Sequence, residues 1–263
     1  MPSVVHILEV FGDFACFSSP ESKVERMSLP VPTPSVARGI LDSIYVKPPE
    51  FRWQVTQIEI FEPIRFIALR RNEVKEKISV LDVNAWMQGK KNPEPILADA
   101  DKNITGTDTK GRTQRQTMAL QNVKYRIHAR IVPWPEAGVR QASLDEQFAR
   151  RARSGKCFCQ PSFGCREFPA YFRYIEADEP PVTPEPIDLD IGWMVYDVFD
   201  LSTSNRILCT GTLDKKSANY SRYIGQPAIS FFYAVVKNGV LKIPDYSDSS
   251  VRKLTSLEGE VTL

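Results

Sequence analysis

The sequence predicts an α+β protein in which a β-α-β unit at the N-terminus precedes a mostly antiparallel sheet. An apolar strand over residues 4–11 is followed by a helix over about 35–46, which begins after Pro34. The second half instead contains short apolar runs separated by turn residues, which is typical of antiparallel strands. With 263 residues, 42% of them hydrophobic, the chain can bury a substantial core without a disulfide or a structural metal.

Two further strands complete the N-terminal unit. Residues 52–61 alternate apolar and polar side chains imperfectly, and residues 118–132 alternate clearly. The segment 73–112 between them is polar and weakly periodic, which predicts a long insertion or a hairpin. This β-α-β…β order fits a ferredoxin-like sheet with its second helix shortened or displaced, and it assigns residues 1–134 to the first domain.

The remaining elements predict a second domain over residues 135–245 and a frayed tail over 246–263. Ser143 and Glu146 form a capping-box pattern, so a short helix is expected from Ser143 to a stop at Gly155. Strands are then expected over 164–175, 191–201, 206–213 and 229–243, the last folding as a hairpin at Asn238-Gly239.

Charge is unevenly distributed, although the net charge is only +2. Residues 109–135 contain six basic and no acidic side chains, whereas residues 175–190 contain six acidic and no basic ones. Such separation can draw a polyanion to one face, and it is equally compatible with two solvated surfaces that have no partner.

Localisation and cofactors follow from what the chain lacks. No apolar run approaches the ~20 residues that span a membrane, and the N-terminus has no secretory signal. Five irregularly spaced cysteines fit reduced thiols and a cytoplasmic protein. The spacing of Cys157, Cys159 and Cys165, in a chain with two histidines, favours idle thiols over a zinc site. We expect no metal and no cofactor.

Several basic and aromatic side chains suit a phosphodiester. Tyr45 and Lys47 follow the first helix and bring a phenol and an ammonium to one edge of the sheet. On the strand 118–132, four basic side chains share one face, where they either contact phosphate or are simply exposed: Lys124, Arg126, His128 and Arg130. Paired-histidine cleavage would need His6 to meet His128, and a packed role for His6 is the simpler reading.

Other basic residues cluster near turns and on the second helix. Arg70 and Arg71 suit a turn at the sheet edge that holds a backbone phosphate. Arg150 and Arg153 share one helix face, with Arg151 turned aside. Such a face is as consistent with simple solvation as with RNA contact.

Six blocks along the chain together resemble one protein family. They are Phe11-Gly12-Asp13-Phe14-Ala15-Cys16-Phe17, Lys23-Val24-Glu25-Arg26, Ala37-Arg38-Gly39-Ile40-Leu41, Ile44-Tyr45-Val46-Lys47-Pro48, Arg70-Arg71-Asn72-Glu73-Val74 and Gly164-Cys165-Arg166-Glu167-Phe168-Pro169. Taken in order, they closely resemble the CRISPR-associated Cas-five family, subtype d (type I-C), of the RAMP superfamily.

The resemblance implies a fold and an activity. The fold is an N-terminal ferredoxin-like domain, related to the RRM, followed by an antiparallel sheet domain. The activity is metal-independent endonucleolytic cleavage of the CRISPR repeat, leaving a 2′,3′-cyclic phosphate and a 5′-hydroxyl. The protein then stays on the 5′ handle of the CRISPR RNA (crRNA) as a subunit of the Cascade complex, beside its backbone and large subunits. Binding of double-stranded DNA is also implied.

The family's catalytic tyrosine maps onto Tyr45. Its other catalytic members, an adjacent Lys-His pair, are absent, because Ser143-Leu144 stand in their place. Two interpretations remain. In the first, Tyr45 still acts on the 2′-hydroxyl while Lys47, Arg140 or Lys156 stabilises the phosphorane. In the second, the protein only binds the 5′ handle of the crRNA and does not cut. The resulting catalytic candidates are Tyr45, Lys47 and Lys156, and the RNA-binding candidates are Lys23, Arg26, Arg38, Arg70, Arg71, Arg115, Lys124, Arg126, His128, Arg150 and Arg153.

Overall fold

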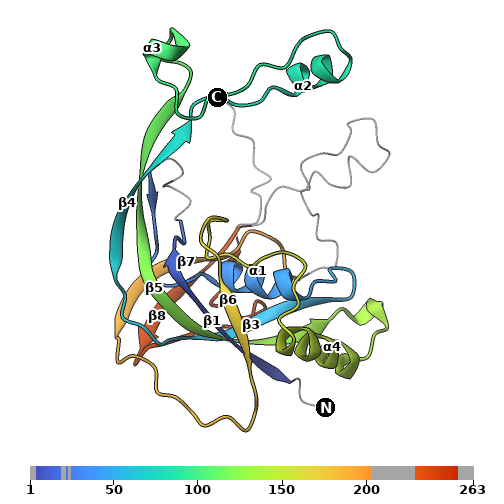
Figure 1. Ribbon diagram of the computed structural model, residues 1–263. Coiled ribbons are helices and arrows are strands. Elements are labelled where there is room, and N and C mark those ends of the chain that lie inside the picture. Colours follow the sequence, from blue (N-terminus) through green and yellow to red (C-terminus); the bar gives the residue numbers. More distant parts are fainter. Residues whose placement is uncertain (1–3, 19–21, 23–24, 203–228, 254–263) are drawn as a thin grey trace, which may run out of the picture.

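The structure is a computed structural model that describes residues 4–18, 22, 25–202 and 229–253. It has a mixed α/β architecture around one large, mainly antiparallel sheet (Figure 1). Among the described residues, no helix has both the length and the apolar character needed to cross a membrane. The elements are β1 (Val5–Ala15), β2 (Arg26–Met27), α1 (Pro34–Ile44), β3 (Phe51–Ile60), β4 (Phe66–Val74), α2 (Val80–Met87), α3 (Lys102–Thr105), β5 (Arg112–Pro133), a 3-10 turn (Pro135–Ala137), α4 (Gln141–Arg153), β6 (Tyr171–Ile175), β7 (Leu189–Asp197), β8 (Ser230–Lys237), β9 (Val240–Lys242) and β10 (Arg252–Lys253).

The long strand β5 organises the sheet. β1 and β3 pair with it on either side, and β4 pairs with its N-terminal part. β6 extends the sheet beyond β1, and β9 and β8 extend it beyond β3, so the order is β10-β8-β9-β3-β5-β1-β6. The sheet therefore continues across the boundary expected near residue 134.

The helices α1 and α4 lie on the same face of this sheet. Leu8 and Val10 of β1 are fully buried on that face. The His6 ring meets Phe148 of α4 with centroids 4.9 Å apart, and Phe148 in turn meets Trp53 of β3 at 4.6 Å. Alternation along the strands thus places one row of side chains against the helices and the next row on the opposite face.

A two-stranded arm leaves the body of the molecule. β4 and the N-terminal part of β5 pair from Phe66 opposite Leu120 to Val74 opposite Arg112, and α2 and α3 lie at the far end (Figure 1). The polar segment 73–112 forms the outer part of this arm. The basic pair at residues 70–71 lies inside β4 rather than at a turn.

Several predicted elements are confirmed and some boundaries are corrected. β3 occupies the predicted strand, and β8 and β9 form the predicted hairpin, with Asn238 and Gly239 at positive φ. β1 continues to Ala15, beyond its predicted end. The capping box at Ser143 is wrong, because α4 begins at Gln141 and Ser143 lies exposed within the helix.

Two expectations concern the end of the chain. The strand predicted over 206–213 lies outside the described residues. Within the segment expected to be a frayed tail, Tyr246 is buried and β10 pairs with β8, so this part is held against the sheet. Residues 254–263 lie outside the described part.

Candidate active site at the end of the first helix

Tyr45 is the first residue after α1, and local backbone contacts fix its position. Thr33 caps the start of the helix through Val36 N at 3.2 Å, with Pro34 in the first turn. At the other end, Tyr45 is extended, and its N–H donates to Leu41 O at 2.9 Å. The Tyr45 carbonyl accepts from Trp53 Nε1 at 3.1 Å. The phenol is therefore set where α1 meets β3.

The Tyr45 side chain is more enclosed than the sequence suggested, since the residue is only 3% exposed. Its ring stacks on Phe51, with the centroids 5.2 Å apart. Lys47 Nζ lies 6.0 Å from the centre of the tyrosine ring. The phenol and the ammonium expected together do lie together, but the ring forms part of the core.

Burial controls the protonation of Tyr45. Desolvation raises the pKa of the phenol above its ordinary value, and Glu50 adds to this, while Lys47 and Arg151 act in the opposite direction. A tyrosine that removes the proton of the 2′-hydroxyl would need a lowered pKa. Because the net direction is upward, Tyr45 is protonated at neutral pH and is placed to donate a proton or a hydrogen bond.

Lys47 is the more exposed member of the pair. Its side chain is 45% exposed, and Nζ lies 3.0 Å from both carboxylate oxygens of Glu50. The pKa of Lys47 is raised, chiefly by this hydrogen-bonded carboxylate. The ammonium is therefore charged and accessible, and it is held by a carboxylate that an incoming phosphate could displace.

Arg151 belongs to this site, although the sequence suggested that it turned aside. Its Nε donates to the carbonyl of Ile44 at 2.7 Å, and its guanidinium lies 4.2 Å from the centre of the Phe158 ring. Helical spacing offered a signal, because Arg151 follows the buried Leu144 and Phe148 at i+7 and i+3 and so shares their side of α4. That side faces the end of α1.

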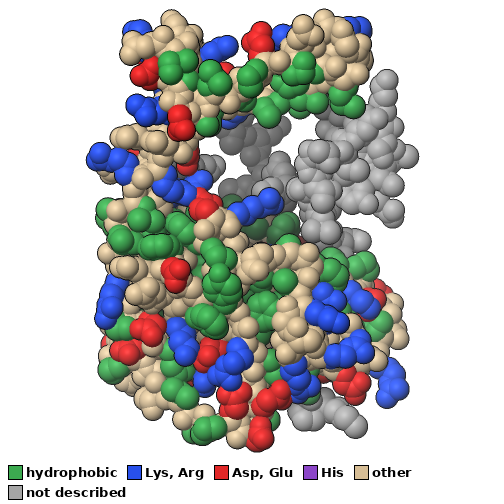
Figure 2. Space-filling model, in the orientation of Figure 1, with side chains coloured by type: hydrophobic (Ala, Val, Ile, Leu, Met, Phe, Trp, Pro, Cys, Tyr) green, Lys and Arg blue, Asp and Glu red, His purple; other side chains and the backbone are tan. Residues whose placement is uncertain are grey.

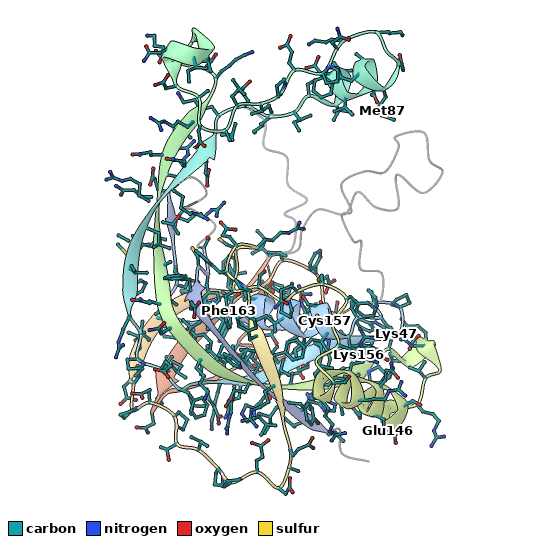
Figure 3. All side chains as sticks on the ribbon, in the orientation of Figure 1. Lys47, Met87, Glu146, Lys156, Cys157 and Phe163 are labelled. Atoms are coloured by element: carbon teal, nitrogen blue, oxygen red, sulfur yellow. The ribbon has the colours of Figure 1, made fainter. Side chains whose placement is uncertain are left out.

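Lys156 lies at the exit of α4. Its N–H bonds to Arg151 O at 3.0 Å, and two residues later Phe158 N donates to Ser43 O at 2.7 Å. This second contact brings the turn after α4 to the last turn of α1. Lys156 is exposed, and Figure 3 shows Lys47 and Lys156 beside α4. The ends of α1 and α4 thus bring Lys47 and Arg151 to the phenol, and Lys156 lies in the turn that follows α4.

The two histidines lie apart. His6 is buried beneath α4, where Nε2 lies 2.9 Å from Asp145 and Nδ1 lies 3.0 Å from the Tyr174 hydroxyl. His128 pairs with the residue after His6, so its side chain lies on the opposite face of the sheet. A paired-histidine mechanism is therefore excluded by the register. Leu144, which stands in place of the family's histidine, is buried.

The basic row on β5 is matched by acidic residues on its neighbours. Glu9 of β1 is buried and lies 3.6 Å from Lys124 Nζ and 3.2 Å from Arg126 Nε. The remaining two members have partners too: His128 lies 3.2 Å from Glu59, and Arg130 lies 2.6 Å from Asp245. This row is largely neutralised, so its charge gives less support for RNA contact than the sequence suggested.

Arg38, another RNA-binding candidate, lies in the interior. The residue is 8% exposed and bonds to Asp197 through Nε at 2.6 Å and Nη2 at 3.0 Å, and also to Asp42. It therefore fastens α1 to β7 and cannot face an RNA. Lys23 lies outside the described residues.

The basic residues of the arm form a mixed-charge cluster near its base. Arg26 of β2 and Arg71 of β4 both bond to Glu167, and Arg26 Nη1 also lies 3.2 Å from Cys165 Sγ. Arg115 stands opposite Arg71 in the β4–β5 ladder, 3.9 Å from Glu73. Arg70 is exposed on the same strand.

Arg150 and Arg153 are exposed residues of α4, and Figure 2 shows Lys and Arg side chains gathered over this helix. Arg153 bonds to both oxygens of Glu176, at 2.5 and 2.7 Å, and Arg150 bonds to Gln147. Arg150 is exposed, so its charge remains accessible.

The described cysteines are all free thiols: Cys165 lies beside Cys16, Cys157 is half-buried and Cys159 is exposed. Within the described ranges, no group of three or more His, Cys, Asp or Glu side chains is arranged to hold a metal ion.

Comparison with known proteins gives consistent matches. A family model described as CRISPR-associated protein (Cas_Cas5), subtype Cas5d, matches residues 7–244. A protein of Mannheimia succiniciproducens named CRISPR pre-crRNA endoribonuclease Cas5d is 35% identical over 252 residues, covering 94% of this chain and 97% of its own. A Thermus thermophilus protein of the same name is 33% identical over 237 residues, covering 90% of each chain. A solved structure titled "Crystal Structure of CRISPR-associated Protein" is similar in fold, with a TM-score of 0.58 at 18% identity, covering 95% of this chain and 97% of that one.

Proposed function

The chain belongs to the Cas5d family of CRISPR-associated proteins, and we propose that it cleaves CRISPR repeat RNA without a metal ion. The observation that carries this proposal is the setting of Tyr45. A protonated phenol stands at the end of α1 with Lys47 and Arg151 beside it, in a chain whose two curated relatives are named pre-crRNA endoribonucleases.

The proposed reaction is a transesterification within the RNA. A solvent base takes the proton of the 2′-hydroxyl as the 2′-oxygen attacks the adjacent phosphorus. The bond from phosphorus to the 5′-oxygen breaks, that oxygen is protonated, and the products are a 2′,3′-cyclic phosphate and a 5′-hydroxyl. Because Tyr45 is protonated, its role is to donate to a phosphate oxygen or to the leaving 5′-oxygen. Lys47, Arg151 and Lys156 supply positive charge for the phosphorane, whose negative charge exceeds that of the phosphodiester.

Replacing Tyr45 by Phe tests this role, because the change removes only the hydroxyl and keeps the stack on Phe51. We expect the single-turnover cleavage rate of cognate repeat RNA in EDTA to fall by roughly 10² or more, the usual contribution of one acid–base group. The dissociation constant for a repeat RNA with a 2′-deoxy cleavage site should stay unchanged.

Tyr125 supplies the matched control, because it is also 3% exposed and its phenol is buried in the core. The Tyr125→Phe variant should cut at the wild-type rate. Equal cutting by wild type and Tyr45→Phe would remove Tyr45 from the mechanism. If the wild type binds the repeat tightly but never cuts it, the protein is instead a non-catalytic subunit that grips the handle, which is the alternative favoured by the absent Lys-His pair.

We further propose that β1, α1, β3, β5, α4 and β6 form a ferredoxin-like unit. The sheet order β3-β5-β1-β6, with every neighbour antiparallel and α1 and α4 as the connections, supports this assignment. In this proposal the protein keeps the 5′ handle and joins the Cascade complex, and duplex DNA is a second ligand. Co-purification of a short RNA ending in a 2′,3′-cyclic phosphate or a 5′-hydroxyl handle would test retention.

A further inference from the structure

Two cysteines far apart in sequence meet at the end of β1. The N–H of Cys16 donates to Phe163 O at 3.0 Å, and the next residue, Gly164, has φ of +83°. A Cβ on Gly164 would fall 2.0 Å from the Cys16 carbonyl oxygen, so only glycine allows this close approach. Figure 3 marks the position of Phe163. The backbone thus presses the segment carrying Cys165 against Cys16.

The two thiols form a polar pair in a nearly dry setting. Cys16 is fully buried and Cys165 is 8% exposed. The two thiols lie close enough to interact; Cys16 Sγ is also 3.4 Å from the Ser18 hydroxyl oxygen, and Arg26 Nη1 lies 3.2 Å from Cys165 Sγ. Arg71 lies close enough to add its charge, and Glu167 binds both arginines. These groups come from β1, β2, β4 and the segment before β6.

This environment separates the two thiols chemically. The interaction with Cys16, together with Arg26 and Arg71, lowers the pKa of Cys165 to about 6. The same interaction and burial raise the pKa of Cys16. At neutral pH the pair therefore consists of one thiolate and one neutral thiol, which is the arrangement of an oxidation-prone cysteine beside a resolving cysteine.

We propose that Cys16 and Cys165 are a redox-active pair that a peroxide converts to a reversible intramolecular disulfide. In the first step the Cys165 thiolate attacks the peroxide, which is reduced to hydroxide as Cys165 becomes a sulfenic acid. In the second step the Cys16 sulfur displaces water from that sulfenic acid, and the disulfide forms. The first step also removes the thiolate that raises the pKa of Cys16, so it prepares the resolving thiol to react.

The pair is independent of the cleavage site, because neither sulfur contacts the residues around Tyr45 that the proposed reaction uses. Oxidation would remove the negative charge that faces Arg26, leaving the two arginines with Glu167 alone. A thiol reductant returns both cysteines to the starting state.

Peptide mapping tests the proposal on the full chain. Reduced protein is treated with stoichiometric hydrogen peroxide at neutral pH, blocked with a maleimide and digested without reductant. We expect a cross-linked peptide that joins Cys16 to Cys165 and disappears on adding dithiothreitol. Recovery of both cysteines as free, maleimide-labelled peptides, or oxidation of Cys165 beyond sulfenic acid with Cys16 untouched, would overturn the proposal.

Variants assign the two roles. Cys16→Ser should stop at a Cys165 sulfenic acid that dimedone traps, whereas Cys159→Ser, which changes an exposed thiol, should cross-link as the wild type does. A second readout needs no variant: the ultraviolet absorbance of the wild-type protein should gain one thiolate equivalent as pH rises through about 6. The absence of that step would refute the inference even if the serine variants failed to fold.

Discussion

Replacing Arg151 by Met distinguishes this half-buried arginine of α4 from its exposed neighbour Arg150. The change removes a hydrogen bond of 2.7 Å from Nε to the Ile44 carbonyl, while the Met side chain retains apolar contact with Phe158. A hydrogen bond from a charged donor contributes about 1.5–3 kcal/mol, and a cation at a helix C-terminus adds about 0.3–1 kcal/mol. We therefore expect a loss of about 2–3 kcal/mol of unfolding free energy, or about 5–10 °C in Tm for a chain of this size.

The same substitution should also slow cleavage. Arg151 lowers the pKa of Tyr45, so its removal raises that pKa further and takes one positive charge from the site. Arg150→Met is the matched control, because Arg150 is exposed and should change stability by no more than about 0.5 kcal/mol. Thermal unfolding and single-turnover cleavage should both separate the two variants. Equal effects on Tm and rate would refute the placement of Arg151 at the end of α1.

Two other substitutions test the charges that surround α1. Glu50→Gln frees Lys47 and removes a carboxylate that raises the pKa of Tyr45. This variant should therefore bind repeat RNA more tightly than Glu146→Gln does, which removes an equal charge from an exposed position on α4. Weaker binding by Glu50→Gln would contradict this expectation. Because burial raises the folded-state pKa of Tyr45 above that of an ordinary tyrosine, wild-type cleavage should persist through mildly alkaline pH and fall only as the phenol ionises. Glu50→Gln should move that fall to lower pH. Asp197→Ala leaves the buried Arg38 with Asp42 as its carboxylate partner. The free energy of unfolding measured by chemical denaturation should fall by about 3 kcal/mol, the lower end of the cost of breaking a buried ion pair. A decrease below ~1 kcal/mol would show that Asp42 alone is sufficient to hold Arg38.

The sequence predicted those features that depend on local pattern. Alternation identified the strands around His128 and Trp53, and Asn238-Gly239 identified the hairpin, because each signal lies within a few neighbouring residues. The start of α4 was misplaced because Ser143 and Glu146 have capping-box spacing, whereas the backbone enters the helix earlier, at Gln141. β4 was missed because its side chains alternate between exposed and half-buried, without a buried row.

Long-range pairing explains why the RNA-binding candidates were harder to predict. The partner of Arg126 is Glu9, and the partner of Arg130 is Asp245, each more than a hundred residues away in sequence. A run of basic residues therefore resembles a phosphate-binding surface until segments distant in the sequence supply their carboxylates. The same limit applies to the Tyr45 pKa, whose direction depends on burial that no local pattern encodes.

The anchoring of α1 gives the strongest physical reason to place chemistry at its end. Arg38 ties the middle of the helix to β7 through a buried ion pair, and Arg151 ties its last carbonyl to α4. Trp53 holds the carbonyl of Tyr45 itself, so the phenol has little freedom to move. A proton donor gains most when its geometry is fixed before the substrate arrives, because no reorganisation is then needed during reaction. Rigidity at this point, with accessible ammonium groups on Lys47 and Lys156 around it, distinguishes the end of α1 from the neutralised basic row on β5.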